Sequence, residues 1–292
     1  MTNSFLQYLQ FEKRYSPNTI LAYQTDLDQL RTFLKSAFPE TVIQDANHAI
    51  LRDWLIELAE SGLSETSINR KLVTIRMFFK FLLKRGIIAQ NPAAKIFSLK
   101  VKKRLPQFVR QQDMDQVFKA EIYSPEFQIA RDYLIIELLY GTGMRLSELI
   151  TLKESSIDIL NSTIKVLGKR NKERIIPIPQ NLLSLLRNYM ALKNETFKGN
   201  ASDNLIVSNS GKKSYSMMIN RVVKKCLQGV STDKKNPHIL RHTYATHLLE
   251  RGADLNAVKD LLGHQSLAAT QVYTHNTLGK LKKIFDQAHP KA

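Results

Sequence analysis

A histidine and an arginine lie three residues apart in the segment PHILRH, residues 237–242. Pro237 suits the first position of a helix, and residues three apart then project from one face. The guanidinium of Arg241 has paired donors that match two phosphate oxygens, while the imidazole of His238 can bond a third oxygen or accept a proton. The spacing therefore predicts a phosphate-binding site on a helix.

A metal site is the competing interpretation of this helix, since His238 and His242 are four residues apart. The zinc-peptidase pattern requires a glutamate directly after its first histidine, and Ile239 occupies that position. We therefore expect no bound metal, and we interpret His242 as a residue that packs on the helix surface.

Arg145 follows the glycine-containing segment GTGM, residues 141–144. This segment lacks the Gly-Lys-Ser/Thr of the Walker pattern, and Leu146 or Ser147 occupies the third glycine position of the dinucleotide pattern. One interpretation is a tight turn between two helices. The other adds Arg145 as a second cation that clamps a phosphate group.

Two further residues are candidates for catalysis only in combination with this phosphate site. Lys169 lies in the polar segment GKRNK, and lysines at an exposed hairpin tip often serve solubility alone. Tyr273 follows the segment LLGH, and a tyrosine on an amphipathic helix usually packs in a core or an interface. In combination with the two arginines, Lys169 becomes a candidate proton donor and Tyr273 a candidate nucleophile.

The first third of the chain has the periodicity of helices. Ser16 and Pro17 predict a helix start, a second helix begins near Asp45, and a third runs from Ser64 to Gly86. A polar stripe on the third helix has two interpretations, a solvated surface or a DNA contact. Its members are Asn69, Arg76, Lys80 and Lys84.

The C-terminal two thirds mix helices and strands. Apolar and polar residues alternate on both sides of GKRNK, which predicts a β-hairpin, and the last part of the chain returns to helical patterns with glycines at C-terminal caps. The predicted elements are a helix over 131–140, a turn flanked by Gly141 and Gly143, a helix over 146–152, hairpin strands over 162–168 and 173–179, a short strand over 203–208, and helices from Pro237 onward that end at Gly252 and Gly263.

The sequence carries a formal net charge of +17 over 292 residues. Residues 1–93 hold 11 basic and 9 acidic residues, so the remaining 199 residues contribute +15. Such an excess argues for a polyanionic partner such as nucleic acid. A basic segment after the helical first third is either an extended linker suited to a phosphate backbone or a soluble tether. Its basic residues are Lys95, Lys100, Lys102, Lys103 and Arg104.

A single cysteine, Cys226, excludes an internal disulfide framework and fits a reducing compartment. The N-terminal residues lack the order of a signal peptide. The most apolar run, YLIIELLY, is far shorter than the roughly 20 residues that span a membrane. We therefore expect a soluble cytoplasmic protein.

Four segments resemble, in order and spacing, those of the tyrosine site-specific recombinases of the phage integrase family, and look most like the Xer branch. They are GTGMRLSEL, GKRNKERIIPI, HILRHTYATHLLERGADL and VKDLLGHQSLAATQVYTH. The segments SPNTILAYQTDL and SINRKLVTIRMFFKFL resemble the core-binding domain of that family, so the resemblance covers nearly the whole chain.

The resemblance implies a mainly α fold of the DNA breaking–rejoining type. Residues 1–93 would form a helical, SAM-like core-binding domain that binds DNA, and residues 94–107 a basic linker. Residues 108–292 would form an α+β catalytic domain that is mostly helical and contains a small antiparallel sheet.

By the same resemblance, Tyr273 attacks the scissile phosphate and leaves a 3′-phosphotyrosine and a free 5′-hydroxyl, with His238 accepting the tyrosine proton and Lys169 protonating the leaving oxygen. The side chains that surround the phosphate are expected to be Arg145, Lys169, His238, Arg241 and His264. The departures from the family pattern, expected to change packing or contacts, include Met144, Leu146 and Arg170. DNA contacts are expected at Asn69, Arg76, Lys80, Lys102, Lys103, Arg104 and Arg170.

No nucleotide cofactor and no metal are implied, because the phosphoester energy is retained in the phosphotyrosine bond. The expected partners are a double-stranded DNA recombination site, other recombinase protomers in a homo- or hetero-tetramer, and a DNA translocase, but no membrane. The C-terminal segment LGKLKKIFDQAHP would pack into a neighbouring protomer or form an intramolecular helix.

Three other functions remain open from the sequence. A mobile-element integrase would share the same catalytic centre. A nick-and-close topoisomerase uses similar residues without pairing two sites. A catalytically silent DNA-binding protein would need at least one broken catalytic position, and the sequence shows none.

Overall fold

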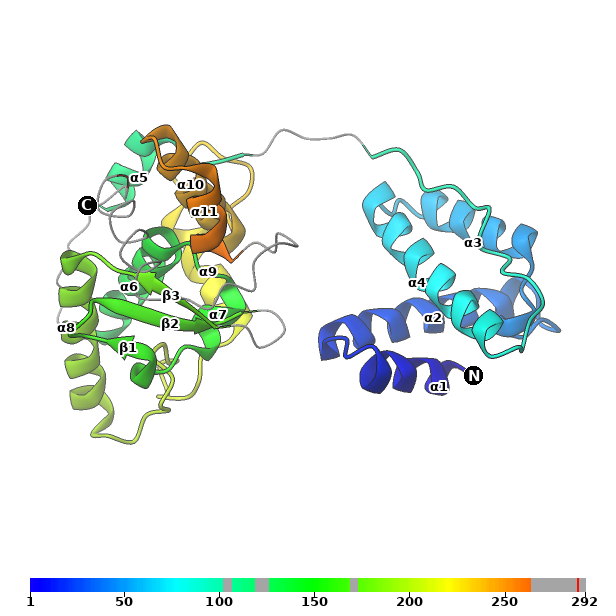
Figure 1. Cartoon of the computed structure of the whole chain (residues 1–292), viewed down its shortest axis with the longest axis horizontal. Helices are drawn as coiled ribbons and strands as arrows, with labels where there is room; N and C mark the ends of the chain where they lie inside the picture. Colours follow the sequence, from blue (N-terminus) through cyan, green and yellow to red (C-terminus); the bar gives the residue numbers. More distant parts are fainter. Residues whose placement is uncertain (102–106, 119–125, 169–172, 264–287, 289–292) are drawn as a thin grey trace. The chain divides into compact units, whose positions relative to one another are not determined.

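The computed structural model describes residues 1–101, 107–118, 126–168, 173–263 and 288. The chain divides into two compact units, residues 1–104 and residues 105–292 (Figure 1). The fold is mainly α, with one three-stranded antiparallel sheet in the second unit, as predicted. Within the described residues, no helix is long and apolar enough to cross a membrane.

The first unit is built from helices. Ser16 caps the long helix α2 by accepting a hydrogen bond from the Thr19 backbone N–H, and Ser64 caps α4 in the same way with Ser67. Both predicted starts are confirmed. The elements are α1 (Thr2–Gln7), the π-helical turn η1 (Tyr8–Glu12), α2 (Pro17–Ala37), the 3₁₀ turn η2 (Ile43–Asp45), α3 (His48–Glu60) and α4 (Glu65–Lys84).

The second helix begins three residues later than predicted. Residues 43–45 form the 3₁₀ turn, and Asn47 then caps α3 by accepting a hydrogen bond from the Ile50 backbone N–H. The apolar face predicted for the third helix is buried in the core of this unit. Its residues are Ile68, Leu72, Ile75, Phe79 and Leu82.

A charged group lies inside the first unit, between α2 and α4. The carboxylate of Asp26 is fully buried and accepts hydrogen bonds from Arg70, Lys71 and Thr74. Because a buried carboxylate is costly unless it is paired, this cluster fixes how α4 packs on α2.

The second unit packs helices around the sheet. The strands are ordered β1-β2-β3 and antiparallel, with Thr163 opposite Pro177 and Leu167 opposite Glu173. The predicted hairpin is therefore confirmed. The elements are α5 (Gln111–Val117), α6 (Phe127–Thr142), α7 (Leu146–Thr151), η3 (Glu154–Ser156), β1 (Ile157–Asp158), β2 (Thr163–Leu167), β3 (Glu173–Pro177), α8 (Gln180–Phe197), α9 (Ser216–Cys226), α10 (Pro237–Glu250) and α11 (Leu255–Leu262).

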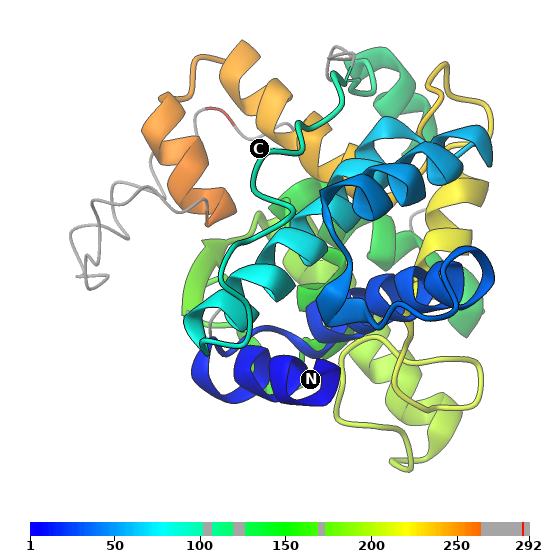
Figure 2. The same ribbon diagram turned by 90° about the vertical axis from the view of Figure 1, so that its right-hand side faces the viewer.

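Helix α6 is the centre of this unit. Residues 134–142 are all buried, and α8 and α10 pack against the helix. Figure 2 shows α10 and α11, in two shades of orange, lying next to each other, and α11 also contacts β3. This packing brings the ends of α6, α10, α11 and β3 into one region.

The turn after α6 requires a glycine. Gly143 has φ +60°, and a Cβ at this position would lie 2.4 Å from the ring of buried Tyr244. The prediction that Gly141 flanks the turn is wrong, because Gly141 lies in the last turn of α6. The helix continues until a left-handed residue ends it at Gly143.

The strand predicted over residues 203–208 is wrong. Leu205, Ile206 and Val207 are fully buried, but this segment makes only isolated bridges, Lys153 with Asn204 and Val207 with Lys213. A short apolar run does not distinguish a strand from a buried connection. The predicted helix-ending glycines are confirmed, since Gly252 and Gly263 have φ values of +85° and +64°.

Candidate active site

Arg241 lies one turn into α10 and is almost completely buried, with 8% of its surface exposed. Pro237 is the first residue of the helix, and the side chain of Asn236 caps it by accepting a hydrogen bond from Ile239 N–H. The Arg241 guanidinium donates hydrogen bonds to the carbonyl oxygens of Gly143 and Leu262. Arg241 therefore joins the end of α6 to the end of α11.

Burial, together with the nearby cations Arg145 and Arg174, lowers the pKa of Arg241 to about 10. The side chain still carries its charge at neutral pH. The two carbonyl bonds use two of its five N–H groups, so the guanidinium retains donors for an oxyanion.

Arg145 lies at the start of α7 and is partly exposed. Its guanidinium donates to Glu148 Oε1 at 2.8 Å and to the carbonyl oxygen of Gly263 at 3.1 Å. The Arg145 backbone N–H donates to Glu148 Oε2 at 2.7 Å, which caps the helix. The two predicted phosphate-binding arginines, Arg145 and Arg241, thus meet at the C-terminal end of α11.

Arg174 and Glu148 complete this cluster, and neither was predicted. Arg174 forms a two-pronged ion pair with the Glu148 carboxylate, at 2.7 and 2.8 Å, and its Nε donates to the Leu261 carbonyl oxygen at 3.0 Å. Burial would raise the pKa of Glu148, but Arg174 and Arg145 outweigh it and lower that pKa. Glu148 is therefore an anion at neutral pH.

The signal for Arg174 was present in the hairpin pattern. In β3, Arg174 and Ile176 alternate with more exposed residues and are buried, so an arginine occupies a core-facing position. A buried arginine requires an anionic partner. Glu148, three residues after Arg145 and itself buried, was the available carboxylate.

The cluster has an unbalanced charge. Three guanidinium groups, those of Arg145, Arg174 and Arg241, surround the single carboxylate of Glu148. The local charge is therefore about +2, which suits a bound phosphate group. The C-terminal carbonyls of α11 carry partial negative charge and help to hold these cations in place.

His238 lies at the second position of α10, one turn before Arg241, and its side chain is exposed. Three other predicted catalytic residues, Lys169, His264 and Tyr273, lie outside the described residues. Two of them adjoin described elements in sequence. His264 directly follows Gly263, which accepts the Arg145 hydrogen bond, and Lys169 lies between β2 and β3.

The predicted DNA contacts fall into two groups. The carboxamide of Asn69 both donates to the Leu99 carbonyl at 2.9 Å and accepts from the Leu99 backbone N–H at 2.8 Å, and Arg76 donates to the Ile96 carbonyl. These side chains hold residues 96–99 against α4, and Lys80 is exposed on the same helix. A role in DNA binding stays a prediction. Lys102, Lys103, Arg104 and Arg170 lie outside the described residues.

Other candidate sites are weaker. Among the described residues, no group of three or more His, Cys, Asp or Glu side chains is arranged to hold a metal ion. Burial raises the pKa of Cys226 to about 11, so its thiol is protonated and a poor nucleophile at neutral pH.

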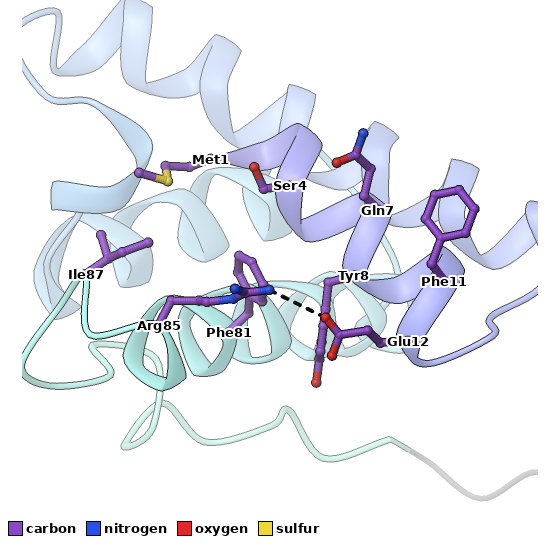
Figure 3. A pocket seen from close by; sticks show the side chains of 9 residues that line it. All are labelled: Met1, Ser4, Gln7, Tyr8, Phe11, Glu12, Phe81, Arg85 and Ile87. Carbon is purple, nitrogen blue, oxygen red and sulfur yellow. Dashed lines mark hydrogen bonds and ion pairs between the residues drawn. The ribbon is translucent and has the colours of Figure 1, made fainter.

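The first unit contains a groove of about 560 Å³ between its N-terminal helical turns and the end of α4. Figure 3 shows Arg85 of the α4 end reaching to Glu12, with a 3.5 Å ion pair, beside the rings of Phe81 and Tyr8. None of the residues predicted for catalysis lines this groove.

Two family models cover most of the chain. Residues 2–86 match the phage integrase N-terminal SAM-like domain, and residues 107–279 match the phage integrase family. The chain therefore belongs to the phage integrase family, the tyrosine recombinases. It is 37% identical to the tyrosine recombinase XerC of Chlorobaculum parvum, over 99% of this chain and 94% of that protein. It is 36% identical to XerC of Bacillus subtilis, over 99% and 95% of the two chains.

Solved structures share the fold. A post-cleavage complex of the XerH site-specific recombinase with palindromic difH substrate matches with a TM-score of 0.71 at 21% identity, over 97% of this chain and 83% of that chain. The Tn1549 transposon integrase bound to transposon right end DNA matches with a TM-score of 0.68 at 19% identity, over 97% and 98% of the two chains.

Proposed function

We propose that this chain is a Xer-type tyrosine recombinase that breaks and rejoins DNA through a 3′-phosphotyrosine bond at Tyr273. The observation that carries the proposal is the meeting of Arg145 and Arg241 at the end of α11, immediately before His264. These two arginines are 96 positions apart in sequence, and neither belongs to α11. They nevertheless donate hydrogen bonds to the carbonyl oxygens of the adjacent residues Gly263 and Leu262.

The charge of the cluster fits the reaction. A phosphodiester has one negative charge, and attack by a phenolate oxygen places a second on the phosphoryl oxygens in the transition state. A fixed local charge of about +2 stabilises that state more than the ground state, which is the requirement for catalysis. Because the guanidiniums are already held by carbonyls and Glu148, little reorganisation accompanies the reaction.

The proton transfers complete the cleavage step. The Tyr273 oxygen forms a bond to phosphorus as the bond from phosphorus to the 5′ oxygen breaks. His238 accepts the tyrosine proton, and Lys169 gives a proton to the departing 5′ oxygen. His264 adds a hydrogen bond to a phosphoryl oxygen. Rejoining to another 5′-hydroxyl reverses these steps, so the reaction consumes no nucleotide.

The biological role we propose is the resolution of chromosome or plasmid dimers in the cytoplasm, with a part in chromosome partition at cell division. Its support is the 34–38% identity to XerC proteins along nearly the full chain. The active form would be a homo- or hetero-tetramer on two paired DNA sites, with a DNA translocase as a further partner. The C-terminal segment LGKLKKIFDQAHP would pack into the neighbouring protomer.

Covalent capture on genomic DNA tests this function. Purified protein is incubated with sheared DNA of its host genome, the mixture is denatured, and protein-linked fragments are sequenced. We expect adducts on 3′ phosphates at one sequence, and resolution of a supercoiled plasmid that carries two copies of it. No adduct on any 3′ phosphate would contradict the proposal.

Two outcomes of this experiment would assign a different role. Adducts at the borders of an inserted element would indicate a mobile-element integrase. Relaxation of a plasmid that lacks the captured sequence, without resolution of the two-site plasmid, would indicate a nick-and-close topoisomerase.

A further inference from the structure

The last three carbonyl groups at the end of α11 are each bound by a different arginine. Arg174 binds the carbonyl of Leu261, Arg241 binds that of Leu262, and Arg145 binds that of Gly263. The final carbonyls of a helix have no partner within the helix, so this arrangement satisfies groups that otherwise need water or a cap.

Arg174 differs from the other two arginines in its position. Its side chain is 5% exposed, and it points inward from β3 on the same side as Ile176. A Cβ at Gly263 would lie 3.2 Å from Arg174 Cδ, so the end of α11 rests directly on this side chain. Arg174 is buried beneath the cluster rather than presented to a ligand.

Arg174 also holds the residue that orients Arg145. Its two terminal nitrogens bind the two oxygens of Glu148, and the same carboxylate receives the side-chain and backbone donors of Arg145. One arginine therefore contacts both α7, which carries Arg145, and α11, which leads directly to His264.

We propose that Arg174 is a positioning residue for DNA cleavage, which sets the geometry of Arg145 and of the C-terminal end of α11. This inference rests on the proposed function, because it concerns the same phosphate site. Arg174 binds Glu148 through two parallel bonds and α11 through a third, and this three-way geometry requires a guanidinium.

The loss of Arg174 has a defined electrostatic consequence. Glu148 would remain buried. Of the two arginines that form ion pairs with it, Arg145 would be left. Arg145 would then be drawn to the carboxylate, and the local charge would fall from about +2 to about +1. Both changes lower the stabilisation of a developing negative charge at the phosphate.

The test compares cleavage with DNA binding in Arg174→Met and Arg174→Lys. The probe is a nicked duplex that carries the genomic sequence to which the wild-type protein attaches covalently. A misplaced catalytic group can cost about 10²-fold in rate, so we expect about that loss of single-turnover cleavage in Arg174→Met. DNA affinity should stay within about threefold, since Arg174 is buried and the exposed contacts are unchanged. Arg174→Lys should remain well below wild type, because an ammonium cannot replace the planar fork.

Arg131→Met is the matched control. Arg131 is also a buried arginine of the second unit, and it pairs with Asp132 and binds the Val207 carbonyl near the other end of α6. It should lose stability in urea without losing cleavage by the folded, DNA-bound protein. Equal behaviour of the Arg131→Met and Arg174→Met proteins would overturn the positioning role.

The pH profile gives a readout that a loss of stability alone would not produce. Without Arg174, the pKa of Glu148 should rise, so cleavage by Arg174→Met should decline at a higher pH than wild-type cleavage as the solution is acidified. In the Glu148→Gln background, the substitution of Arg174 should lose part of its effect, because the two residues act through one pair.

The outcomes separate this inference from the proposed function. If wild-type protein forms no adduct, the proposed function fails. If wild-type protein forms the adduct and Arg174→Met cleaves equally fast with an unchanged pH profile, only the positioning role fails.

Discussion

The Arg145 guanidinium donates a 3.1 Å hydrogen bond to the carbonyl oxygen of Gly263, a residue 118 positions further along the chain. This bond links the start of α7 to the end of α11. Gly263 is also the residue that directly precedes His264, a predicted catalytic residue, in sequence.

Removal of Arg241 should abolish most cleavage while DNA binding is retained. The loss of one preorganised charge donor costs about 10²–10³-fold in rate, and Arg241→Ala should fall in or beyond this range. Single-turnover cleavage of a nicked duplex, measured beside DNA affinity, checks this expectation. Near-normal cleavage by Arg241→Ala would show that this guanidinium does not bind the reacting phosphate.

Gly143→Ala should destabilise the second unit by about 2 kcal/mol or more. The added methyl group meets the ring of buried Tyr244 at 2.4 Å, and φ of +60° is unfavourable for alanine. Gly252→Ala is the control, because Gly252 has φ +85° and nothing within 4 Å of an added Cβ. Urea unfolding of the two variants should separate the steric cost from the backbone cost. Equal losses would contradict a close approach of α10 to Gly143.

Glu148 should make stability fall in acid. Its folded-state pKa is lowered below the ordinary value of 4.5, so the unfolded chain binds protons more readily than the folded chain. The stabilisation is complete above about pH 4.5 and is lost as the pH falls through the folded-state pKa. Glu148→Gln should lose about 3 kcal/mol at neutral pH, and its stability should fall less steeply in acid. Parallel pH curves for the two proteins would refute the assignment.

Lys80→Ala should weaken binding to DNA of any sequence to a similar extent and reduce the slope of log affinity against log salt by about one. Lys80 is exposed on α4. Asn69→Ala, on the same helix, should instead increase proteolytic cleavage within residues 96–101, because it loses both bonds to Leu99. An unchanged salt slope in Lys80→Ala would exclude a phosphate contact at this lysine.

Much of the fold follows from local sequence signals. Ser16 and Ser64 cap helices where predicted, and the alternation on both sides of GKRNK gives the observed hairpin. Local signals gave wrong predictions where tertiary packing determines the backbone conformation. Gly141 remains helical because α6 is buried on all sides at this point, and Leu205, Ile206 and Val207 are buried in a segment that makes only isolated bridges. Helices α8 and α9 were not predicted, although α8 spans Gln180–Phe197.

The candidate site could also be predicted from the sequence only in part. Arg145 and Arg241 are predictable because a cation near a helix start suggests a phosphate site. Their meeting at Gly263 and Leu262 depends on contacts between residues far apart in sequence, which no local pattern reveals. Arg174 lies only two residues after the polar segment GKRNK, but its inward position in β3 makes it part of the interior.

Identification of the residue joined to DNA is the decisive measurement for the role of Tyr273. Wild-type protein is trapped on its captured sequence in a nicked duplex, digested, and the DNA-linked peptide is sequenced by mass spectrometry. We expect a 3′-phosphotyrosine at Tyr273, and no adduct from a Tyr273→Phe protein that still binds the duplex. An adduct at another residue, or undiminished adduct from Tyr273→Phe, would contradict it.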